Sequence, residues 1–120
     1  MIFELNEEQK TYQQMAREFA DKEIIPYARE LDEKEEFPRE ILKKLHSVGL
    51  HDLAVPEEYG GPGIDSLSYS LIIEQIARGC AGVTVTSSAN GNSLALYPLL
   101  LGGTEEQKQR FLPTICKEGK

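Results

Sequence analysis

The feature that most limits how this chain folds is a run of twenty-six residues, 79–104, without a single Asp, Glu, Lys or Arg. A run this long predicts burial, either in a bilayer or inside a protein. Its middle holds several Ser, Thr and Asn residues and is interrupted by Gly91 and Pro98. The unbroken apolar stretch that a membrane span needs is therefore missing. We expect the run to be buried within a protein, with no membrane span.

The charged residues are unevenly divided between the two halves of the chain. Residues 1–60 hold fifteen acids and eight bases, a net charge of −7, whereas residues 61–120 hold five of each. An acidic chain is poorly suited to phosphate backbones or anionic membranes, so no nucleic-acid or membrane partner is expected. The first residues lack the basic flank and apolar segment of a secretory signal. These features favour a cytoplasmic protein.

Apolar residues at helical spacing recur along the whole chain. They predict helices after Asn6 with a kink at Pro26, from Pro38 to Gly49, from Ser66 to Gly79, within the uncharged run, and after Thr104. The β-branched residues 83–86 would also suit a short strand, but no second strand-like run exists to pair with them. We therefore predict an all-α fold, an orthogonal or up-down array of five to six helices forming one domain, 1–120.

The cysteines and histidines show no pattern of a metal or catalytic site. Cys80 and Cys116 are separated by thirty-five residues and lack a nearby Cys or His at ligand spacing, so two reduced cysteines and no metal are expected. His46 and His51 stand outside any recognisable motif. They are predicted to be surface or helix-end residues.

A loop rich in proline and glycine, residues 56–63, lacks the preceding strand and the spacing of a dinucleotide-binding fingerprint. Taken alone, it predicts a turn between two helices whose glycines supply positive φ angles. Together with other motifs, however, it carries a resemblance. The motifs are Ile24-Ile25-Pro26, Phe37-Pro38, Leu45 to Gly49, Val55-Pro56-Glu57-Glu58-Tyr59-Gly60-Gly61, and Gly102-Gly103-Thr104-Glu105-Glu106-Gln107-Lys108. With them, the chain resembles the N-terminal helical domain of the acyl-CoA dehydrogenase family.

The resemblance implies a part of a larger flavoenzyme that introduces a double bond into an acyl-CoA thioester. It spans nearly all 120 residues but only about the first third of a family member, so the middle β domain and the C-terminal helical domain are expected to be absent. The family's catalytic glutamate belongs to that C-terminal domain, and no catalytic residue is assigned here. FAD is implied in the parent enzyme rather than in this chain alone, with electron-transferring flavoprotein as acceptor and a homo-oligomeric state.

The family places part of its acyl pocket on this domain, and the matching segment supplies Asn90, Gly91 and Leu94 as predicted substrate-binding residues. From the residues alone, a buried helix with locally satisfied Ser and Asn side chains explains this segment as well. A related acyl-CoA oxidase or flavin monooxygenase, and a stand-alone helical interaction module, remain as alternatives. We also expect exposed apolar surface near 94–101, and hence self-association.

Overall fold

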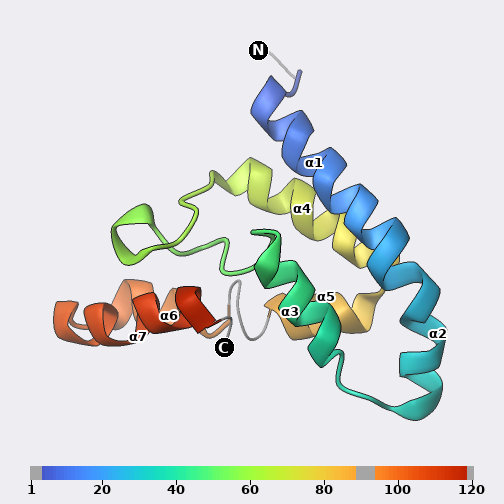
Figure 1. Ribbon diagram of the computed structural model, residues 1–120. Helices are drawn as coiled ribbons and strands as arrows, with labels where there is room; N and C mark the ends of the chain where they lie inside the picture. The colour runs from blue at the N-terminus through green and yellow to red at the C-terminus, as the bar shows by residue number, and fades with distance from the viewer. Residues whose placement is uncertain (1–3, 89–93, 119–120) are drawn as a thin grey trace.

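The computed structural model describes residues 4–88 and 94–118, and every regular element in those residues is helical. The elements, drawn in Figure 1, are α1 (Glu7–Phe19), the π-helical turn η1 (Ala20–Ile24), α2 (Ile25–Lys34), α3 (Arg39–Ser47), the 3-10 turn η2 (Glu57–Tyr59), α4 (Ser66–Gly79), α5 (Ala81–Ser87), α6 (Leu96–Gly102) and α7 (Glu105–Glu118). With α1, η1 and α2 counted as one bent helix, the described residues form six helices. The predicted all-α fold is confirmed.

The first helix is bent where the sequence places a proline. At its start, the backbone amide of Gln9 donates to Asn6 Oδ1 at 2.8 Å, which completes the predicted capping box. Pro26 has no amide proton, and its ring crowds the preceding turn, so a regular α-helix cannot pass through it. The backbone instead widens, and the amide of Ile25 donates to the carbonyl of Ala20, five residues back. The predicted kink is therefore a π-helical turn.

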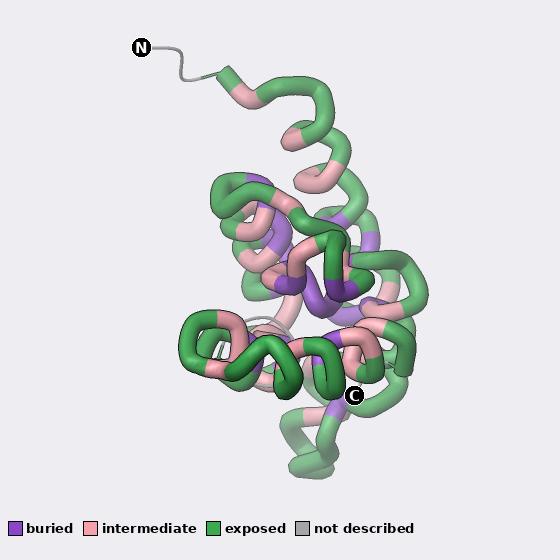
Figure 2. Tube along the Cα trace, turned by 90° about the vertical axis from the view of Figure 1, so that its left-hand side faces the viewer, coloured by how far each residue is buried: buried purple, intermediate pink, exposed green. Residues whose placement is uncertain are grey.

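Helix α4 packs along α1 and η1 and closes the larger of two apolar cores. The buried residues of this core are Ala16, Phe19, Ala20, Ile24, Ile41, Leu45, Leu50, Leu53, Ile72, Ile76 and Val83. Gly79 lets the end of α4 approach η1 closely, because a Cβ at this position would lie 3.0 Å from Ile24 Cγ2 and 3.2 Å from Ala20 Cβ. Figure 2 shows the buried positions gathered where these helices meet.

A smaller second core joins α6 and α7 to the loop that contains η2. Its buried residues are Val55, Tyr59, Leu96 and Leu112. Helix α7 starts with the predicted capping box, in which the amide of Thr104 donates to Gln107 Oε1 at 2.8 Å. In Figure 1 this unit lies at the lower left, beside the larger α1–α5 unit.

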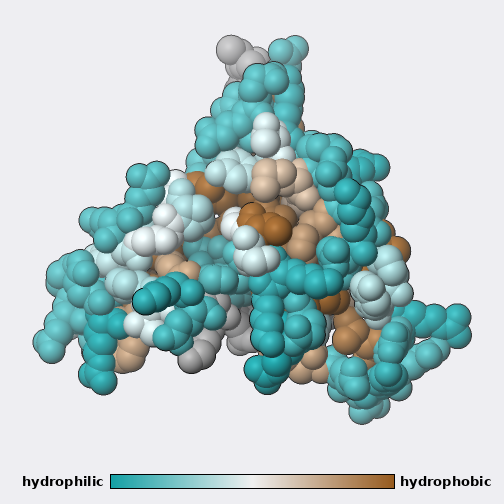
Figure 3. Space-filling model, in the orientation of Figure 1, coloured by the Kyte–Doolittle hydropathy of each residue, from teal (hydrophilic) through white to brown (hydrophobic). Residues whose placement is uncertain are grey.

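The molecule is flatter and more exposed than a compact protein of its size. Its extents are 42 × 42 × 20 Å and its radius of gyration is 14.6 Å, against about 13.6 Å expected for 120 residues. Its accessible surface is 7605 Å², against about 6500 Å² for a compact 13.4 kDa protein. On the face drawn in Figure 3, apolar residues gather near the centre and hydrophilic residues surround them.

The uncharged run is only partly buried, which corrects the expectation that it lies inside the protein. Val83, Ser87 and Leu96 are buried, whereas the large apolar side chains of Val85, Leu94, Tyr97 and Leu101 are exposed. The β-branched residues of the run lie in α5, so the helical interpretation holds. Exposed apolar surface near 94–101 is confirmed.

Candidate functional site

The predicted acyl-pocket segment follows α5. Asn90 and Gly91 lie outside the described residues. Leu94 is described, and its backbone amide donates to the carbonyl of Ser88 at 3.3 Å. Its side chain is 73% exposed, so it belongs to the surface rather than to a closed pocket. The assignment of these three residues to an acyl pocket stays a prediction.

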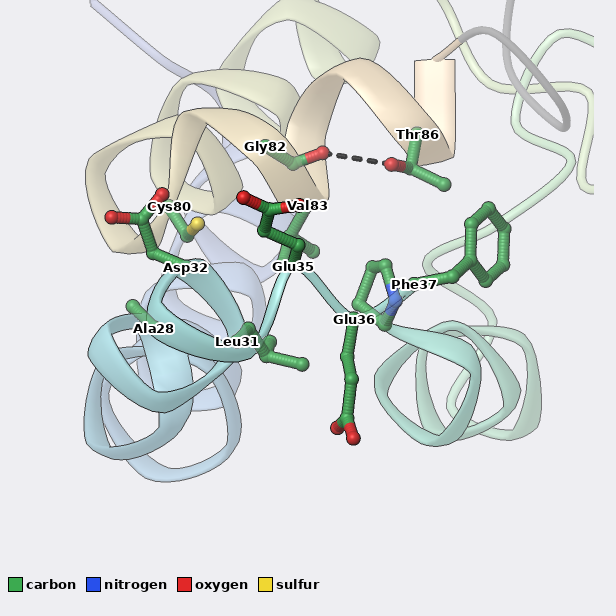
Figure 4. Close-up of a pocket in the computed structure, with 11 residues that line it drawn as sticks. Ala28, Leu31, Asp32, Glu35, Glu36, Phe37, Cys80, Gly82, Val83 and Thr86 are labelled. Carbon is green, nitrogen blue, oxygen red and sulfur yellow. Dashed lines mark hydrogen bonds between the residues drawn. The ribbon is translucent and has the colours of Figure 1, made fainter.

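A hollow of about 450 Å³ lies along α5, directly before this segment in the sequence. It is bounded by α2, the connection from α2 to α3, and α5. The residues that line it, shown in Figure 4, are Ala28, Leu31, Asp32, Glu35, Glu36, Phe37, Pro38, Cys80, Gly82, Val83 and Thr86. The Thr86 hydroxyl donates to the Gly82 carbonyl at 2.9 Å, so this polar group is satisfied within the helix. The α5 wall is therefore apolar in character, with Val83 at its centre.

The opposite wall of the hollow is acidic at one end. Figure 4 shows the carboxylates of Asp32 and Glu35 at the same end as Cys80, and Phe37 at the other. Glu35 ends α2 in the left-handed conformation, with φ of 53°. Because like charges repel, this acidic end is unsuited to a phosphate or carboxylate ligand. The hollow can hold an uncharged or cationic group.

The loop that carries the strongest sequence motif is a structural turn. Gly60 and Gly63 have φ angles of 88° and 59°, as the sequence predicted for its glycines. A Cβ on Gly61 would lie 2.1 Å from the carbonyl oxygen of Val55, so only glycine fits there. The amide of Gly63 donates to the same Val55 carbonyl at 3.1 Å. The loop is folded back on itself rather than opened around a ligand.

This loop is fastened to α7 by a hydrogen bond between two of the family-like motifs. The hydroxyl of buried Tyr59 lies 3.0 and 2.9 Å from the two carboxylate oxygens of Glu105 and donates to them. Burial and the neighbouring carboxylate raise the pKa of Tyr59. Hydrogen bonds from Gln109 and Tyr59 lower the pKa of Glu105. The sequence showed both motifs but not that they meet, because Tyr59 and Glu105 lie forty-six positions apart.

His46 lies in the last turn of α3, as predicted for a helix-end residue, whereas buried His51 corrects the prediction. His51 is buried, and its Nδ1 lies 3.0 Å from Oδ1 of Asp52, which is also buried. His46 Nε2 lies 3.7 Å from Asp52 Oδ2 and 2.7 Å from the backbone carbonyl of Cys116. Sequence reasoning missed this cluster because its members come from α3, the following turn and α7. Asp52 offered one signal, since a charged residue stands there between Leu50 and Leu53 of the core.

Other site types find no support in the described part of the chain. Both cysteines are free, as predicted. Residues 4–88 and 94–118 contain no group of three or more His, Cys, Asp and Glu side chains placed to hold a metal ion. No helix in the same residues is long and apolar enough to cross a bilayer.

Comparisons with known proteins bear on the whole chain. A sequence model described as "Acyl-CoA dehydrogenase, N-terminal domain" matches residues 6–119. A probable acyl-CoA dehydrogenase of Bacillus subtilis is 46% identical over 116 residues, which is 97% of this chain and 30% of the relative. The mitochondrial short-chain specific acyl-CoA dehydrogenase of Bos taurus is 45% identical over 98% of this chain and 28% of its own length. The chain thus spans less than a third of these relatives.

Solved structures share the fold closely. Butyryl-CoA dehydrogenase from Megasphaera elsdenii superposes with a TM-score of 0.84 at 35% identity, over 100% of this chain and 32% of that one. Acyl-CoA dehydrogenase from Bacillus anthracis, complexed with FAD, superposes with a TM-score of 0.85 at 35% identity, over 98% of this chain and 20% of that one. A chain in the structure of the electron transferring flavoprotein of Acidaminococcus fermentans superposes with a TM-score of 0.84 at 38% identity, over 98% of this chain and 30% of that one.

Proposed function

Because this chain belongs to the acyl-CoA dehydrogenase family, whose N-terminal helical domain it forms, we propose that it supplies one wall of the acyl pocket in a larger FAD-dependent enzyme. That enzyme would remove two hydrogens from the α and β carbons of an acyl-CoA thioester. The observation that carries the proposal is the uncharged run, which leaves apolar side chains exposed on α5 and α6. Such a surface is suited to an acyl chain and to further protein.

Asn90, Gly91 and Leu94 are the proposed wall residues. Gly91 would let an acyl chain lie close to the backbone, and Leu94 would supply apolar contact. The acidic end of the hollow beside α5 supports a role in binding the acyl part rather than the CoA part of the substrate, since Asp32 and Glu35 would repel the phosphates of CoA. This domain would therefore meet the uncharged acyl part of the substrate.

Chemistry and cofactor are assigned to polypeptide beyond these 120 residues. FAD would be held by the parent enzyme, and no catalytic residue is proposed in this chain. Electron-transferring flavoprotein is proposed as the electron acceptor. The excess accessible surface of about 1100 Å² supports contacts with further domains or subunits, and a homo-oligomer is proposed. A cytoplasmic location stays a prediction, because the names of some relatives carry the word mitochondrial.

Expression of the chain by itself tests where the chemistry resides. Residues 1–120, incubated with FAD, butyryl-CoA and a dye as electron acceptor, should remain colourless after desalting and show no dehydrogenation. Turnover above the rate of free FAD would refute the assignment of chemistry to other domains. The complete polypeptide encoded by the gene, assayed in parallel, should be yellow and active. If that polypeptide is inactive and binds no acyl-CoA, a stand-alone interaction module is supported instead.

The acyl wall is tested in the complete polypeptide with Gly91→Val. The added side chain should raise KM for longer acyl-CoA substrates and leave the shortest ones less affected, because it would narrow the pocket. Gly102→Ala is the matched control, since a Cβ there would meet no atom within 4 Å. An unchanged chain-length profile in Gly91→Val would contradict the proposed wall. Rapid reoxidation of the reduced enzyme by oxygen would favour the oxidase or monooxygenase alternative.

A further inference from the structure

The connection between α2 and α3 presents an aromatic ring between two hollows. Phe37 is 54% exposed and lines both the hollow beside α5 and a second one of about 430 Å³ between α2 and α3. Leu31 and Pro38 also line both hollows. The amide of Glu36 donates to the carbonyl of Leu31 at 3.1 Å, and the amide of Arg39 donates to that of Phe37 at 2.7 Å. Backbone hydrogen bonds therefore hold the turn that carries the ring, while half of the ring faces solvent.

The carboxylates around this ring are not neutralised. Asp32, Glu35 and Glu36 are exposed, and none of them forms an ion pair within the described residues. The guanidinium carbon of Arg39 lies 5.6 Å from the centroid of the Phe37 ring. Three carboxylates against this one guanidinium leave the surface negative. We call Asp32, Glu35, Glu36 and Phe37 the acidic edge; it is suited to an apolar side chain flanked by bases.

Helix α7 has the opposite pattern. Its acids lie in the first turn and at the last residue, and the bases between them are Lys108, Arg110 and Lys117. These three bases form no ion pair with any described residue. Phe111 is 45% exposed, and the guanidinium carbon of Arg110 lies 5.2 Å from its ring centroid. Arg110 and Lys117 are about two turns apart and so share one side of the helix. We call Arg110, Phe111 and Lys117 the basic face.

The acidic edge and the basic face of one molecule cannot meet. In Figure 1, α7 lies at the lower left and the connection from α2 to α3 at the lower right, on opposite sides of a molecule that is 42 Å wide. A contact between the two surfaces therefore requires two molecules.

We propose that the acidic edge of one copy of this chain binds the basic face of a second copy. Phe111 would pack against Phe37, and Arg110 and Lys117 would face the carboxylates. Exposed ion pairs are individually weak, so burial of the two rings supplies most of the affinity and the charges select the orientation. Because two different surfaces meet, the contact is head-to-tail unless a two-fold axis repeats it in both directions. A second copy is favoured over an unrelated basic segment because this chain itself carries the matching ring and bases.

The inference rests on the proposed homo-oligomer but not on the proposed acyl chemistry. The carboxylates of Asp32 and Glu35 lie beside Cys80, which precedes α5 (Figure 4). The proposed acyl wall follows the other end of the same helix in the sequence. The two roles therefore use different ends of α5.

Reversal of the charges on each surface tests the contact by sedimentation equilibrium of the 120-residue chain. Asp32→Lys/Glu36→Lys makes the edge basic, and Arg110→Glu/Lys117→Glu makes the face acidic; all four side chains are exposed, and circular dichroism checks that the helices remain. Each variant alone should associate about tenfold more weakly than the wild type, because like charges then meet. An equal mixture of the two should associate to within about threefold of the wild type, because every edge then faces a complementary face.

Glu8→Lys/Glu74→Lys is the matched control. It changes the net charge by the same amount as the edge variant, at exposed positions on α1 and α4, and should associate like the wild type. Zero-length carbodiimide cross-linking of a mixture of isotope-labelled and unlabelled wild type gives an independent measurement. It should join Lys117 of one copy to Asp32, Glu35 or Glu36 of another.

Three results would overturn the contact. A wild type that stays monomeric at high concentration is the first. Association that neither charge reversal weakens, or weakening that the mixture does not restore, also overturns it while leaving the proposed homo-oligomer standing. None of these results bears on the binding of FAD or acyl-CoA, which the assay of the complete polypeptide measures.

Discussion

Substitution of Gly79 by alanine measures how tightly α4 is packed against the π-helical turn. In an exposed helix, alanine is more stable than glycine by up to about 1 kcal/mol. At Gly79 the new Cβ would lie 3.0 Å from Ile24 Cγ2 and 3.2 Å from both Ile24 Cβ and Ala20 Cβ. Ile24 and Ala20 are fully buried and cannot move into open space. Overpacking of this kind costs about 1–3 kcal/mol.

The free energy lost to overpacking exceeds the free energy that alanine gains over glycine in a helix, because that gain is smaller at the last residue of a helix than in its middle. We expect Gly79→Ala to lower the free energy of unfolding by about 1–2 kcal/mol. Urea unfolding followed by circular dichroism gives the measurement. With a slope of about 1.5 kcal/mol per M for a chain of this size, the midpoint should fall by about 0.7–1.3 M.

Gly82→Ala provides the matched comparison. Gly82 is exposed in α5, and the nearest atom to a Cβ there is Cys80 Sγ at 3.8 Å, an ordinary contact. Only the helix propensity changes, and Gly82 is the second residue of α5, so this variant should be more stable than the wild type by up to about 0.5 kcal/mol. If Gly79→Ala is as stable as Gly82→Ala, the close approach of α4 to η1 does not exist in solution, and the reasoning fails.

Three other outcomes follow from contacts in the smaller core and on its surface. Tyr59→Phe removes the hydroxyl bond to Glu105 and should lower Tm by roughly 2–6 °C at neutral pH. The pKa of Glu105 lies below its ordinary 4.5, so the stability that this carboxylate contributes is present above pH 4.5 and is lost as the pH falls through the lowered pKa. In thermal melts from pH 3 to 7, Tyr59→Phe should therefore lose part of this sensitivity to acid. The pKa of Cys116 is raised from 9.0 to about 11, so less of its thiol is present as the reactive thiolate at pH 8. Its reaction with iodoacetamide at that pH, followed by mass spectrometry, should be about 100-fold slower than that of an unperturbed peptide thiol. Leu101, 84% exposed on α6, should promote association of the isolated chain, so Leu101→Ser should shift sedimentation toward the monomer, while a monomeric wild type at high concentration would contradict this.

Local sequence signals identified the helices because their causes are local. The capping boxes at Asn6 and Thr104 each join residues three positions apart, and both are formed. Pro26 perturbs the turn that precedes it, and η1 lies there. The glycines of the 56–63 loop adopt positive φ angles for the same local reason.

The sequence was less informative about which residues are covered. A charge-free run was expected to be buried, yet Val85 and Leu101 face solvent in this chain. Hydropathy shows which surface avoids water, but not whether the covering partner lies within the same 120 residues. The predicted acyl-pocket residues illustrate the same limit, since Leu94 is exposed and the other two lie outside the described part of the chain.

By itself, the sequence determined the helical class, the positions of caps and kinks, and the family to which the chain belongs, because each depends on neighbouring residues or ordered motifs. Only the tertiary structure decided that Tyr59 meets Glu105, that Gly79 touches η1, and that His51 and Asp52 are buried together. These pairings depend on how distant helices cross. Burial then changes the chemistry of the groups involved, since a charge that is unremarkable in water requires a partner once water is excluded.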